Sequence, residues 1–293
     1  FASAPEPPIA FKMSSPVKDT LIYLPTNNCA RIMFFVKANA LEGFLDIKTP
    51  KDYGGLRSDA FTAINPQAKF PALVVGSVDA DEDGSSGGRL CLYESQVILE
   101  YLQDKHASRL KLATVQAFSG LTSEQRALSR LLSQVHDIYI ASPNASQPGF
   151  FATQGVLYKS DMTHEERLKR ARELWIQLDT IEGLMEQGAK GTPAATDPSK
   201  QTFAVGGVCT TCDFALYATY VWLDALVPRS LGGARAALAQ SGFPETEFNW
   251  ADIFHGRPRQ AAFYKHLHGV LDQGVVRDIR EGFIRDVFGT RPE

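Results

Sequence analysis

The sequence lacks long apolar runs, a strong excess of charge of either sign, and a large number of cysteines. A membrane-spanning helix needs roughly 20 consecutive apolar residues, and no stretch of the 293 residues approaches that length. The formal net charge of −3 gives no electrostatic reason to expect nucleic acid or an anionic membrane as the main partner. Four cysteines are too few for the disulfide framework of a secreted protein, which favours a reducing intracellular compartment.

A complete metal site is also missing, so we expect no metal. Cys209 and Cys212 form a CxxC pair, which could be a redox pair or half of a zinc site. No second pair completes such a site, and two small buried residues at a helix start are the better interpretation. The acidic stretch 79–84 imitates the start of a calcium loop, but Leu90 stands where a bidentate glutamate is needed. A solvated hairpin tip explains that stretch better.

The first 18 residues are expected to form a flexible leader, because they contain several prolines and small residues and show no periodicity. A start at Phe1 resembles the residue that follows signal cleavage in proteins sent to algal plastids of the red lineage. Met13 would also serve as an ordinary start. The expected compartment is therefore the cytoplasm or a plastid.

The first third of the chain alternates strand and helix patterns. Short apolar runs predict four strands, and amphipathic spacing predicts two helices, with a polar loop or short helix at 51–63. The predicted strands are 21–25, 43–50, 70–75 and 89–94, and the predicted helices are 30–40 and 95–105. The helix between the first two strands favours a parallel pair, and the direct connection of the last two favours an antiparallel hairpin. A mixed four-stranded sheet with helices on both faces follows.

After about residue 108 the strand patterns stop and long helices follow. Periodic apolar residues predict helices at 121–141, 163–187 and 209–226. The last of these is apolar on nearly every side, so we expect it at the centre of its domain. The chain is therefore predicted to hold an α/β domain over 19–108, a linker over 109–120 and an all-α domain over 121–293.

Two segments together resemble the signature of the glutathione transferases. INPQAKFPALVV, followed by LYESQVILEYLQDK, is similar to the family's Asn-Pro-x-Gly-Lys-Val-Pro-x-Leu, its Glu-Ser and its Ile-x-x-Tyr-Leu helix. Thr210 and Asp213 match the Ser/Thr-x-x-Asp that caps the family's central helix. The resemblance implies a thioredoxin-like N-terminal domain, an all-α helical-bundle C-terminal domain, and glutathione as co-substrate.

The resemblance also implies a set of glutathione-binding residues. In the family the proline at Pro71 is cis, which turns the backbone at Phe70 outward to pair with an extended peptide. Glu94 can accept from the γ-glutamyl ammonium. Ser95, at the start of a helix, can donate to the γ-glutamyl carboxylate.

Two lysines and two departures complete this binding site. Lys51 and Lys69 are expected partners for the glycyl carboxylate, although both would also suit a solvated loop. The family's usual valine is Phe70 here, which narrows the pocket, and its usual glycine is Ala68.

The catalytic turn is expected at PTNNCAR, residues 25–31. It looks most like bacterial and nu-type transferases, which carry Thr/Ser-x-Asn-x-x-Lys/Arg. On that alignment Thr26 supplies the activating hydroxyl and Asn28 a supporting amide. Cys29 is a further candidate, as a thiol that forms a mixed disulfide near a helix N-terminus, or else a small buried core residue.

The implied activity is conjugation of glutathione to a small hydrophobic electrophile, or glutathione-dependent disulfide or peroxide reduction. A non-catalytic binding or scaffold relative is the alternative, and the acidic hairpin, Phe70 and the extended tail would suit it. The resemblance further implies a homodimer. The second substrate is expected in a cleft against the helical domain, with Arg130, Gln134, His136 and Tyr139 as candidates, although a surface or structural role suits His136 better.

Overall fold

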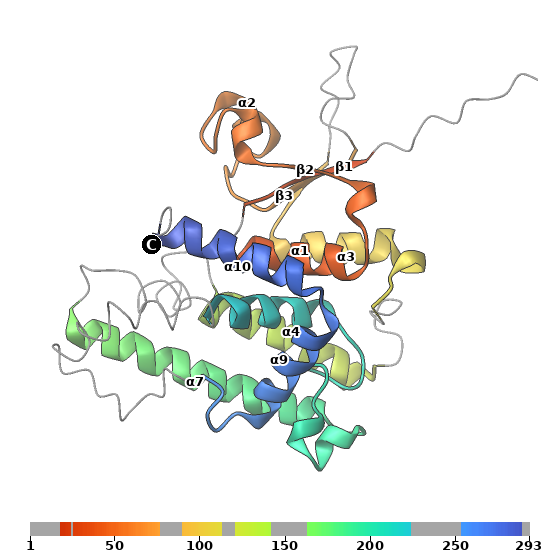
Figure 1. The fold of residues 1–293 in the computed structure, drawn as a ribbon, viewed down its shortest axis with the longest axis vertical. Coiled ribbons are helices and arrows are strands. Elements are labelled where there is room, and N and C mark those ends of the chain that lie inside the picture. Colours follow the sequence, from red (N-terminus) through yellow and green to blue (C-terminus); the bar gives the residue numbers. More distant parts are fainter. Residues whose placement is uncertain are drawn as a thin grey trace, which may run out of the picture.

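The computed structural model describes residues 18–24, 26–76, 90–112, 121–141, 163–223 and 253–288 (Figure 1). The expected leader, the tip of the acidic hairpin and most of the expected linker therefore lie outside the described residues. Four short strands form one sheet: β1 Asp19–Ile22, β2 Leu45–Lys48, β3 Ala72–Val74 and β4 Cys91–Tyr93.

The sheet has the order β2-β1-β3-β4 and the mixed pairing that the element order predicts. β1 runs parallel to β2, and it is antiparallel to β3, which in turn is antiparallel to β4. The strand β1 begins earlier than the predicted start at 21 because Asp19, although charged, is buried. Its carboxylate accepts hydrogen bonds from Lys105 at 2.6 Å, Tyr101 at 3.1 Å and the Gly76 N–H at 2.9 Å.

Helices cover both faces of the sheet, as expected. α1 Asn27–Ala38 and α3 Ser95–Lys105 lie on the face toward the other helices, and α2 Asp59–Ile64 lies on the opposite face (Figure 1). Under α2, Phe61 packs with Ile22 and Ala72 in a small separate core. Short 3₁₀ turns join these elements: η1 Glu42–Phe44, η2 Pro50–Tyr53 and η3 Ala107–Arg109.

The rest of the described chain is helical, also as predicted. The elements are α4 Ser123–Val135, the π-helical segment η5 His136–Ile140, α7 His164–Gly188, a helix over 211–223, α9 Pro258–Val270 and α10 Gln273–Phe288, with 3₁₀ turns η7 Pro193–Ala195 and η8 Pro198–Lys200. Thr122 caps α4 in a complete capping box with Gln125, and Thr163 caps α7. The predicted helix 121–141 thus changes from α to π geometry at His136.

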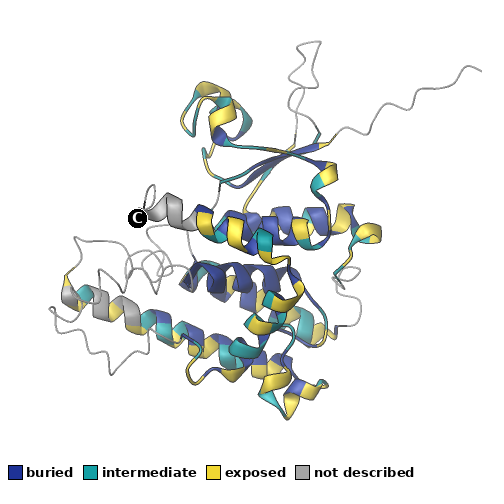
Figure 2. Cartoon of the chain, in the orientation of Figure 1, coloured by how far each residue is buried: buried dark blue, intermediate teal, exposed yellow. Residues whose placement is uncertain are grey.

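The helix over 211–223, called the central helix below, is buried at every position (Figure 2). Its start is fixed by Asp213, whose carboxylate accepts from the Thr210 N–H and the Ala204 N–H, both at 2.6 Å, and from the Thr210 hydroxyl at 2.9 Å. Cys209 and Cys212 lie buried beside this cap as free thiols. Burial raises the pKa of Cys212 strongly and that of Cys209 well above its ordinary value, so both stay protonated and unreactive.

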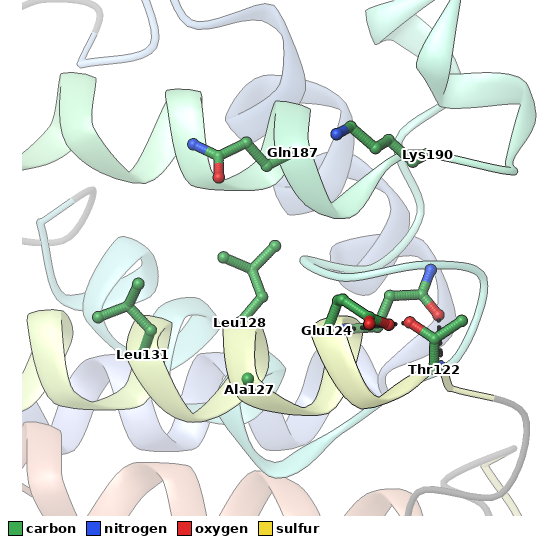
Figure 3. Close-up of a pocket in the computed structure, with 8 residues that line it drawn as sticks. Thr122, Glu124, Ala127, Leu128, Leu131, Gln187 and Lys190 are labelled. Carbon is green, nitrogen blue, oxygen red and sulfur yellow. Dashed lines mark hydrogen bonds between the residues drawn. The ribbon is translucent and has the colours of Figure 1, made fainter.

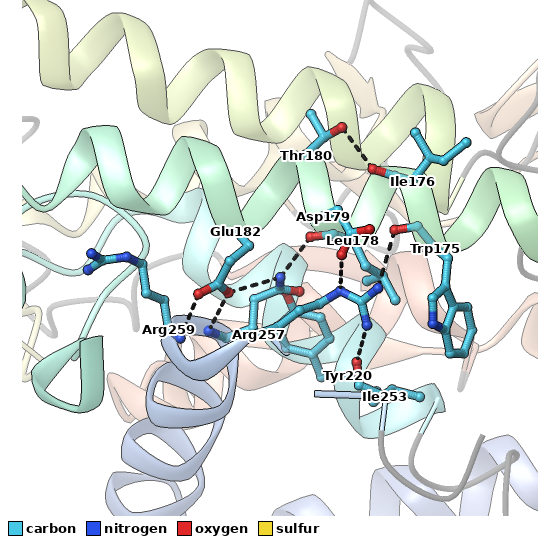
Figure 4. A network of polar contacts seen from close by, with 11 residues as sticks. Trp175, Ile176, Leu178, Asp179, Thr180, Glu182, Tyr220, Ile253, Arg257 and Arg259 are labelled. Atoms are coloured by element: carbon cyan, nitrogen blue, oxygen red, sulfur yellow. Dashed lines mark hydrogen bonds and ion pairs between the residues drawn. The ribbon is translucent and has the colours of Figure 1, made fainter. Parts of the chain in front are cut away.

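A polar network joins α7, the central helix and α9 (Figure 4). Glu182 of α7 accepts from the backbone N–H of Arg259 at 2.8 Å and of Gln260 at 3.1 Å, which are the free donors at the start of α9. Arg257 donates to Asp179 at 2.8 Å, and Tyr220 donates to Gln260 at 2.7 Å. A carboxylate at this position satisfies the N-terminus of α9, where Arg257 itself makes no capping bond.

One apolar core runs from the sheet layer into the helical layer. Edge-to-face ring pairs join α1 to the central helix, with centroids 5.0 Å apart for Phe34–Tyr217 and 5.4 Å apart for Phe35–Phe214. Gln96 of α3 also donates to Thr211 at 2.8 Å. No helix in the described part of the chain is both long and apolar enough to cross a bilayer.

Candidate functional site

The strand registers bring the predicted site segments to one end of the sheet. Because Ala72 pairs with Tyr93 in an antiparallel ladder, Pro71 lies opposite Glu94. Because Ile22 pairs with both Ala72 and Lys48, the chain leaving β1 toward Thr26 runs beside Pro71 on one side and the chain entering η2 on the other. The candidate catalytic turn, the proline turn and the Glu94–Ser95 turn therefore lie together.

Thr26 stands at the start of α1 with its hydroxyl available. Thr26 has extended backbone geometry as the N-cap residue, and its carbonyl accepts from the N–H groups of Cys29 and Ala30. The side chain is half-buried and makes no capping hydrogen bond. The first turn of α1 contains no acidic residue, so the free N–H groups and the positive end of the helix dipole are not neutralised there. This turn can stabilise an anion.

Asn28 and Cys29 differ sharply in exposure. Asn28 is half-buried, and its side-chain oxygen accepts from Arg31 at 2.9 Å. Cys29 is completely buried, with an exposed fraction of 0%. A thiol in that position has the surroundings of a small core residue, and no ligand sulfur can reach it without a change in the packing.

The proline turn is held by Asn65, which ends α2. The Asn65 amide donates to the Lys69 carbonyl at 2.7 Å and accepts from the Gln67 N–H at 3.1 Å, and the Asn65 side chain is fully buried. These bonds fix the loop in front of Phe70–Pro71, whose peptide bond is cis. Within the described residues the backbone N–H and C=O of Phe70 have no hydrogen-bond partner, which leaves both open to an extended ligand.

Ala68 lies in the same loop with a φ of +49°, in the left-handed region that favours glycine. An alanine therefore occupies a backbone conformation that suits glycine better. An alanine there costs about 1 kcal/mol relative to glycine.

Glu94 has the least usual backbone in the site. Its φ of +73° and ψ of +116° lie outside the regions that a side-chain-bearing residue normally adopts. Glu94 is the N-cap of α3 and is exposed, whereas Ser95 is buried as the first helical residue. Such strain is typically kept where it positions a functional group. Here it directs an exposed carboxylate and a helix N-terminus to the same place.

Lys51 and Lys69 are both exposed. Lys51 lies in η2, which follows the end of β2, and Lys69 directly precedes Phe70. Both lysines are at the site end of the sheet, as the strand order requires. Each can reach into solvent, so either could pair with a carboxylate without a desolvation penalty.

Solved structures share this fold over nearly the whole chain. A glutathione transferase from Phanerochaete chrysosporium, URE2P8, solved with oxidized glutathione, is 15% identical with a TM-score of 0.57 over 95% of this chain and 100% of its own. A glutathione transferase homolog from Drosophila mojavensis with bound glutathione is 18% identical with a TM-score of 0.57, over 93% and 97%. Human glutathione S-transferase T1-1 without ligand is 17% identical with a TM-score of 0.52, over 91% and 90%. No protein-family model and no curated protein sequence matches the chain.

The chain has the glutathione transferase fold. This agreement between the sequence signature and the structural neighbours confirms the thioredoxin-like sheet layer and the helical remainder.

Sequence reasoning missed some residues of this transferase-fold site. Asn65 stands inside the quoted signature, yet its role depends on contacts four residues away that only the folded loop shows. Arg31 belongs to the candidate catalytic turn, and its side chain is buried against Asp137 of the helical layer, a contact that the sequence does not predict. The signal that could have found it is a charged residue inside an otherwise apolar helix.

The four residues suggested for the second-substrate cleft are not equivalent. His136 is completely buried and faces Thr219 and Asp137, so it is a structural residue rather than a cleft residue. Arg130, Gln134 and Tyr139 are exposed on α4 and η5.

A pocket of about 600 Å³ lies away from the predicted site, between α4 and the end of α7 (Figure 3). Leu128 and Leu131 project from α4 into the space beside Gln187 of α7 and Lys190, which follows the end of that helix (Figure 3). None of the residues that line it belongs to the predicted glutathione site. Within the described part of the chain, no group of three metal-ligating side chains gathers anywhere.

Proposed function

We propose that this protein is a glutathione transferase that activates the glutathione thiol with Thr26. The observation that carries the proposal is the convergence, at one end of the sheet, of the α1 N-terminus, the Phe70 backbone and the strained Glu94–Ser95 turn. Their chemistry suits three parts of glutathione: the thiol, the cysteinyl backbone and the γ-glutamyl group. The bound glutathione of several structural neighbours supports the same ligand here.

In the proposed complex the γ-glutamyl group lies at the start of α3. Its carboxylate accepts from the Ser95 hydroxyl and the free N–H groups of that helix, and its ammonium pairs with the exposed Glu94 carboxylate. The cysteinyl backbone pairs with Phe70 in the manner of an added strand. Lys51 or Lys69 pairs with the glycyl carboxylate.

This placement brings the glutathione sulfur to the start of α1. A free thiol has a pKa of about 8.5, so only a few per cent is thiolate at pH 7. Lowering that pKa by about two units requires roughly 2.7 kcal/mol of preference for the anion. A hydrogen bond from the Thr26 hydroxyl together with the helix N-terminus can supply it. The thiolate then forms a carbon–sulfur bond with the electrophile, and the displaced group leaves with the electron pair.

Complete burial of Cys29 favours conjugation over disulfide chemistry at the protein's own thiol. A mixed disulfide with Cys29 would require glutathione sulfur to enter the core beneath α1. The reactive thiol in the proposed mechanism is therefore that of glutathione alone.

The test is the activity of Thr26→Ala and Thr26→Ser with glutathione and an aromatic halide electrophile. Thr26→Ala should lower kcat/KM by about a hundredfold, as expected for loss of one hydrogen bond to an anion, while Thr26→Ser should keep most of the activity. Thr196→Ala, an exposed threonine in the helical layer, is the matched control and should leave activity unchanged. Full activity of Thr26→Ala would refute the assigned role, and a wild-type protein that binds no glutathione by calorimetry would favour the non-catalytic alternative.

Two pairs of exposed apolar side chains, each called a patch below, support pairing of two copies, as the resemblance implies. Tyr93 and Val97, at the free edge strand and α3, are 43% and 46% exposed, and Leu131 and Ile176, on α4 and α7, are 47% and 59% exposed. A two-fold axis would let the first patch of each copy meet the second patch of the other. Sedimentation should then report a dimer that Ile176→Glu converts to monomers; a wild-type monomer would contradict the pairing.

A further inference from the structure

Arg31 is an arginine in the core of the protein with only part of its donor capacity in use. Its side chain is 1% exposed, and one terminal nitrogen, Nη2, donates both to Asn28 Oδ1 at 2.9 Å and to Asp137 Oδ1 at 2.7 Å. The Nε and Nη1 atoms are buried without any partner among the described residues. Unsatisfied buried donors destabilise a fold. Any benefit of placing an arginine here must therefore come from the hydrogen bonds that Nη2 makes to Asn28 and Asp137.

The contact with Arg31 determines how the Asn28 amide is turned. The oxygen and nitrogen of an amide are normally distinguished only by their partners. A guanidinium group can only donate hydrogen bonds, so the Asn28 oxygen must face Arg31. The Asn28 amino group is consequently the part of the amide that does not face Arg31. Asn28 is half-buried in the first turn of α1, two residues after Thr26, so its two N–H donors belong to the same turn as the Thr26 hydroxyl.

The helical layer holds Arg31 in place through the π-helical segment η5. Asp137 bonds Arg31 and, at 2.8 Å, His136 Nδ1, while His136 Nε2 lies 2.6 Å from the Thr219 hydroxyl of the central helix. Burial lowers the pKa of His136, so the ring is neutral, donates from Nδ1 to the carboxylate and accepts from Thr219. Burial alone would raise the pKa of Asp137, but the Arg31 charge and the His136 bond hold it well below its ordinary value. The carboxylate is therefore charged throughout the working pH range.

We propose that Arg31 is a positioning residue that fixes Asn28 as a hydrogen-bond donor to the glutathione sulfur, with Asp137 anchoring the arginine from the helical layer. The inference rests on the proposed function. The donor geometry at the catalytic turn is then set across the boundary between the two layers, by Asp137 acting through Arg31.

The test is a double-mutant cycle of Arg31→Lys and Asn28→Ala, read as the pH profile of glutathione conjugation. Lysine keeps the charge opposite Asp137, but a single ammonium cannot hold two acceptors in the guanidinium geometry. Arg31→Lys should raise the pH midpoint of kcat/KM by about one unit and lower kcat/KM about tenfold below the midpoint, with KM for glutathione little changed. Asn28→Ala should do the same, and adding Arg31→Lys to it should change neither quantity further.

The control is Arg257→Lys, another buried arginine held by a carboxylate, with its Nε 2.8 Å from Asp179. This control should lower stability without moving the pH midpoint. The positioning role is refuted if Arg31→Lys reduces kcat/KM by the same factor in the wild-type protein and in Asn28→Ala. It is also refuted if Arg31→Lys reduces kcat/KM without shifting the pH midpoint.

A second variant keeps the test decisive if Arg31→Lys does not fold. Asn28→Asp retains an acceptor for Arg31 but has no N–H to donate, so the midpoint should rise at least as far as in Asn28→Ala. No shift in Asn28→Asp would overturn the inference. Calorimetry of wild type separates the two proposals, because absence of glutathione binding refutes the proposed function, whereas binding without the expected coupling refutes only the role of Arg31.

Discussion

Replacing Glu94 with glycine is expected to stabilise the fold and weaken glutathione binding at the same time. The backbone of Glu94 has φ +73° and ψ +116°, a conformation that costs a residue with a side chain about 1–3 kcal/mol. Glycine adopts positive φ without that cost. The Glu94 side chain is exposed, so its removal leaves no cavity and no buried group without a partner.

The size of the gain follows from two opposing contributions. Glycine relieves the strain, but it also increases the entropy of the unfolded chain, which offsets about 0.4–1 kcal/mol. The net stabilisation is therefore about 1 kcal/mol, which corresponds to a rise in Tm of about 2 °C for a chain of this size. The loss of the carboxylate removes a charge-assisted hydrogen bond to the glutathione ammonium, worth about 1.5 kcal/mol or more, and should weaken binding at least about tenfold.

Glu94→Ala separates the two effects, because alanine loses the carboxylate but keeps the strained backbone. Thermal unfolding without glutathione should place Glu94→Gly above wild type and Glu94→Ala near or below it, and calorimetry should show similar weak binding for both variants. Unliganded protein is needed for the melts, since bound glutathione would itself raise Tm. A Glu94→Gly variant that melts below Glu94→Ala would refute the strain argument, and wild-type affinity in both variants would refute the ligand contact.

Two further predictions concern carboxylates that accept hydrogen bonds at helix starts in the helical layer. Asp213→Asn should lower the free energy of unfolding by about 2 kcal/mol at pH 7, because an amide group would face a backbone N–H in the cap. Burial raises the pKa of Asp213 to about 6, against hydrogen bonds that lower it and an ordinary value of 3.8. The contribution of the protonated Asp213 to the free energy of unfolding is therefore complete below the ordinary pKa of 3.8 and is lost as the pH rises through about 6. The wild-type advantage over Asp213→Asn in urea unfolding should be larger at pH 4 than at pH 7 by up to about 3 kcal/mol; an advantage that grows with pH would contradict this sign. Glu182→Gln should cost about 1–2 kcal/mol, because it removes a charge and an acceptor from the start of α9. The neighbouring exposed Glu186→Gln should change stability by less than about 0.5 kcal/mol, and equal losses in urea unfolding would contradict the capping role.

Local patterns in the sequence predict most of this fold because the apolar residues of each helix or strand recur at the spacing typical of that element. The helix at 95–105 is predicted with both ends correct, since Glu94 and Ser95 signal its start and an amphipathic stripe defines its length. The parallel pairing of β1 with β2 and the antiparallel pairing of β3 with β4 follow from connection lengths, whereas the antiparallel pairing of β1 with β3 does not. The start of β1 is wrong by two residues because Asp19 reads as polar, and only the folded structure brings Lys105 and Tyr101 to its carboxylate.

The assembly of the candidate site could be predicted in outline but not in its supports. Segments that end neighbouring strands must meet at one edge, so Thr26, Pro71 and Glu94 follow from the sheet order. Asn65 could not be assigned, because its two bonds exist only once the loop has closed around it. The π-helical geometry of η5 has no sequence signal, since the apolar stripe of α4 continues through it.

The position of Arg31 in the sequence could have predicted a contact between α1 and the helical layer. Every residue from 29 to 36 is buried, so α1 is packed on all sides and Arg31 has no route to solvent. A guanidinium group in that position must have an acceptor from another element, because an unpaired buried charge would cost several kcal/mol. Asp137 fulfils this requirement from 106 residues away, at the point where the helical geometry changes. The candidate catalytic turn is thus fixed on one side by the sheet that precedes it and on the other by the helical layer, and a local sequence pattern can describe only the first of these.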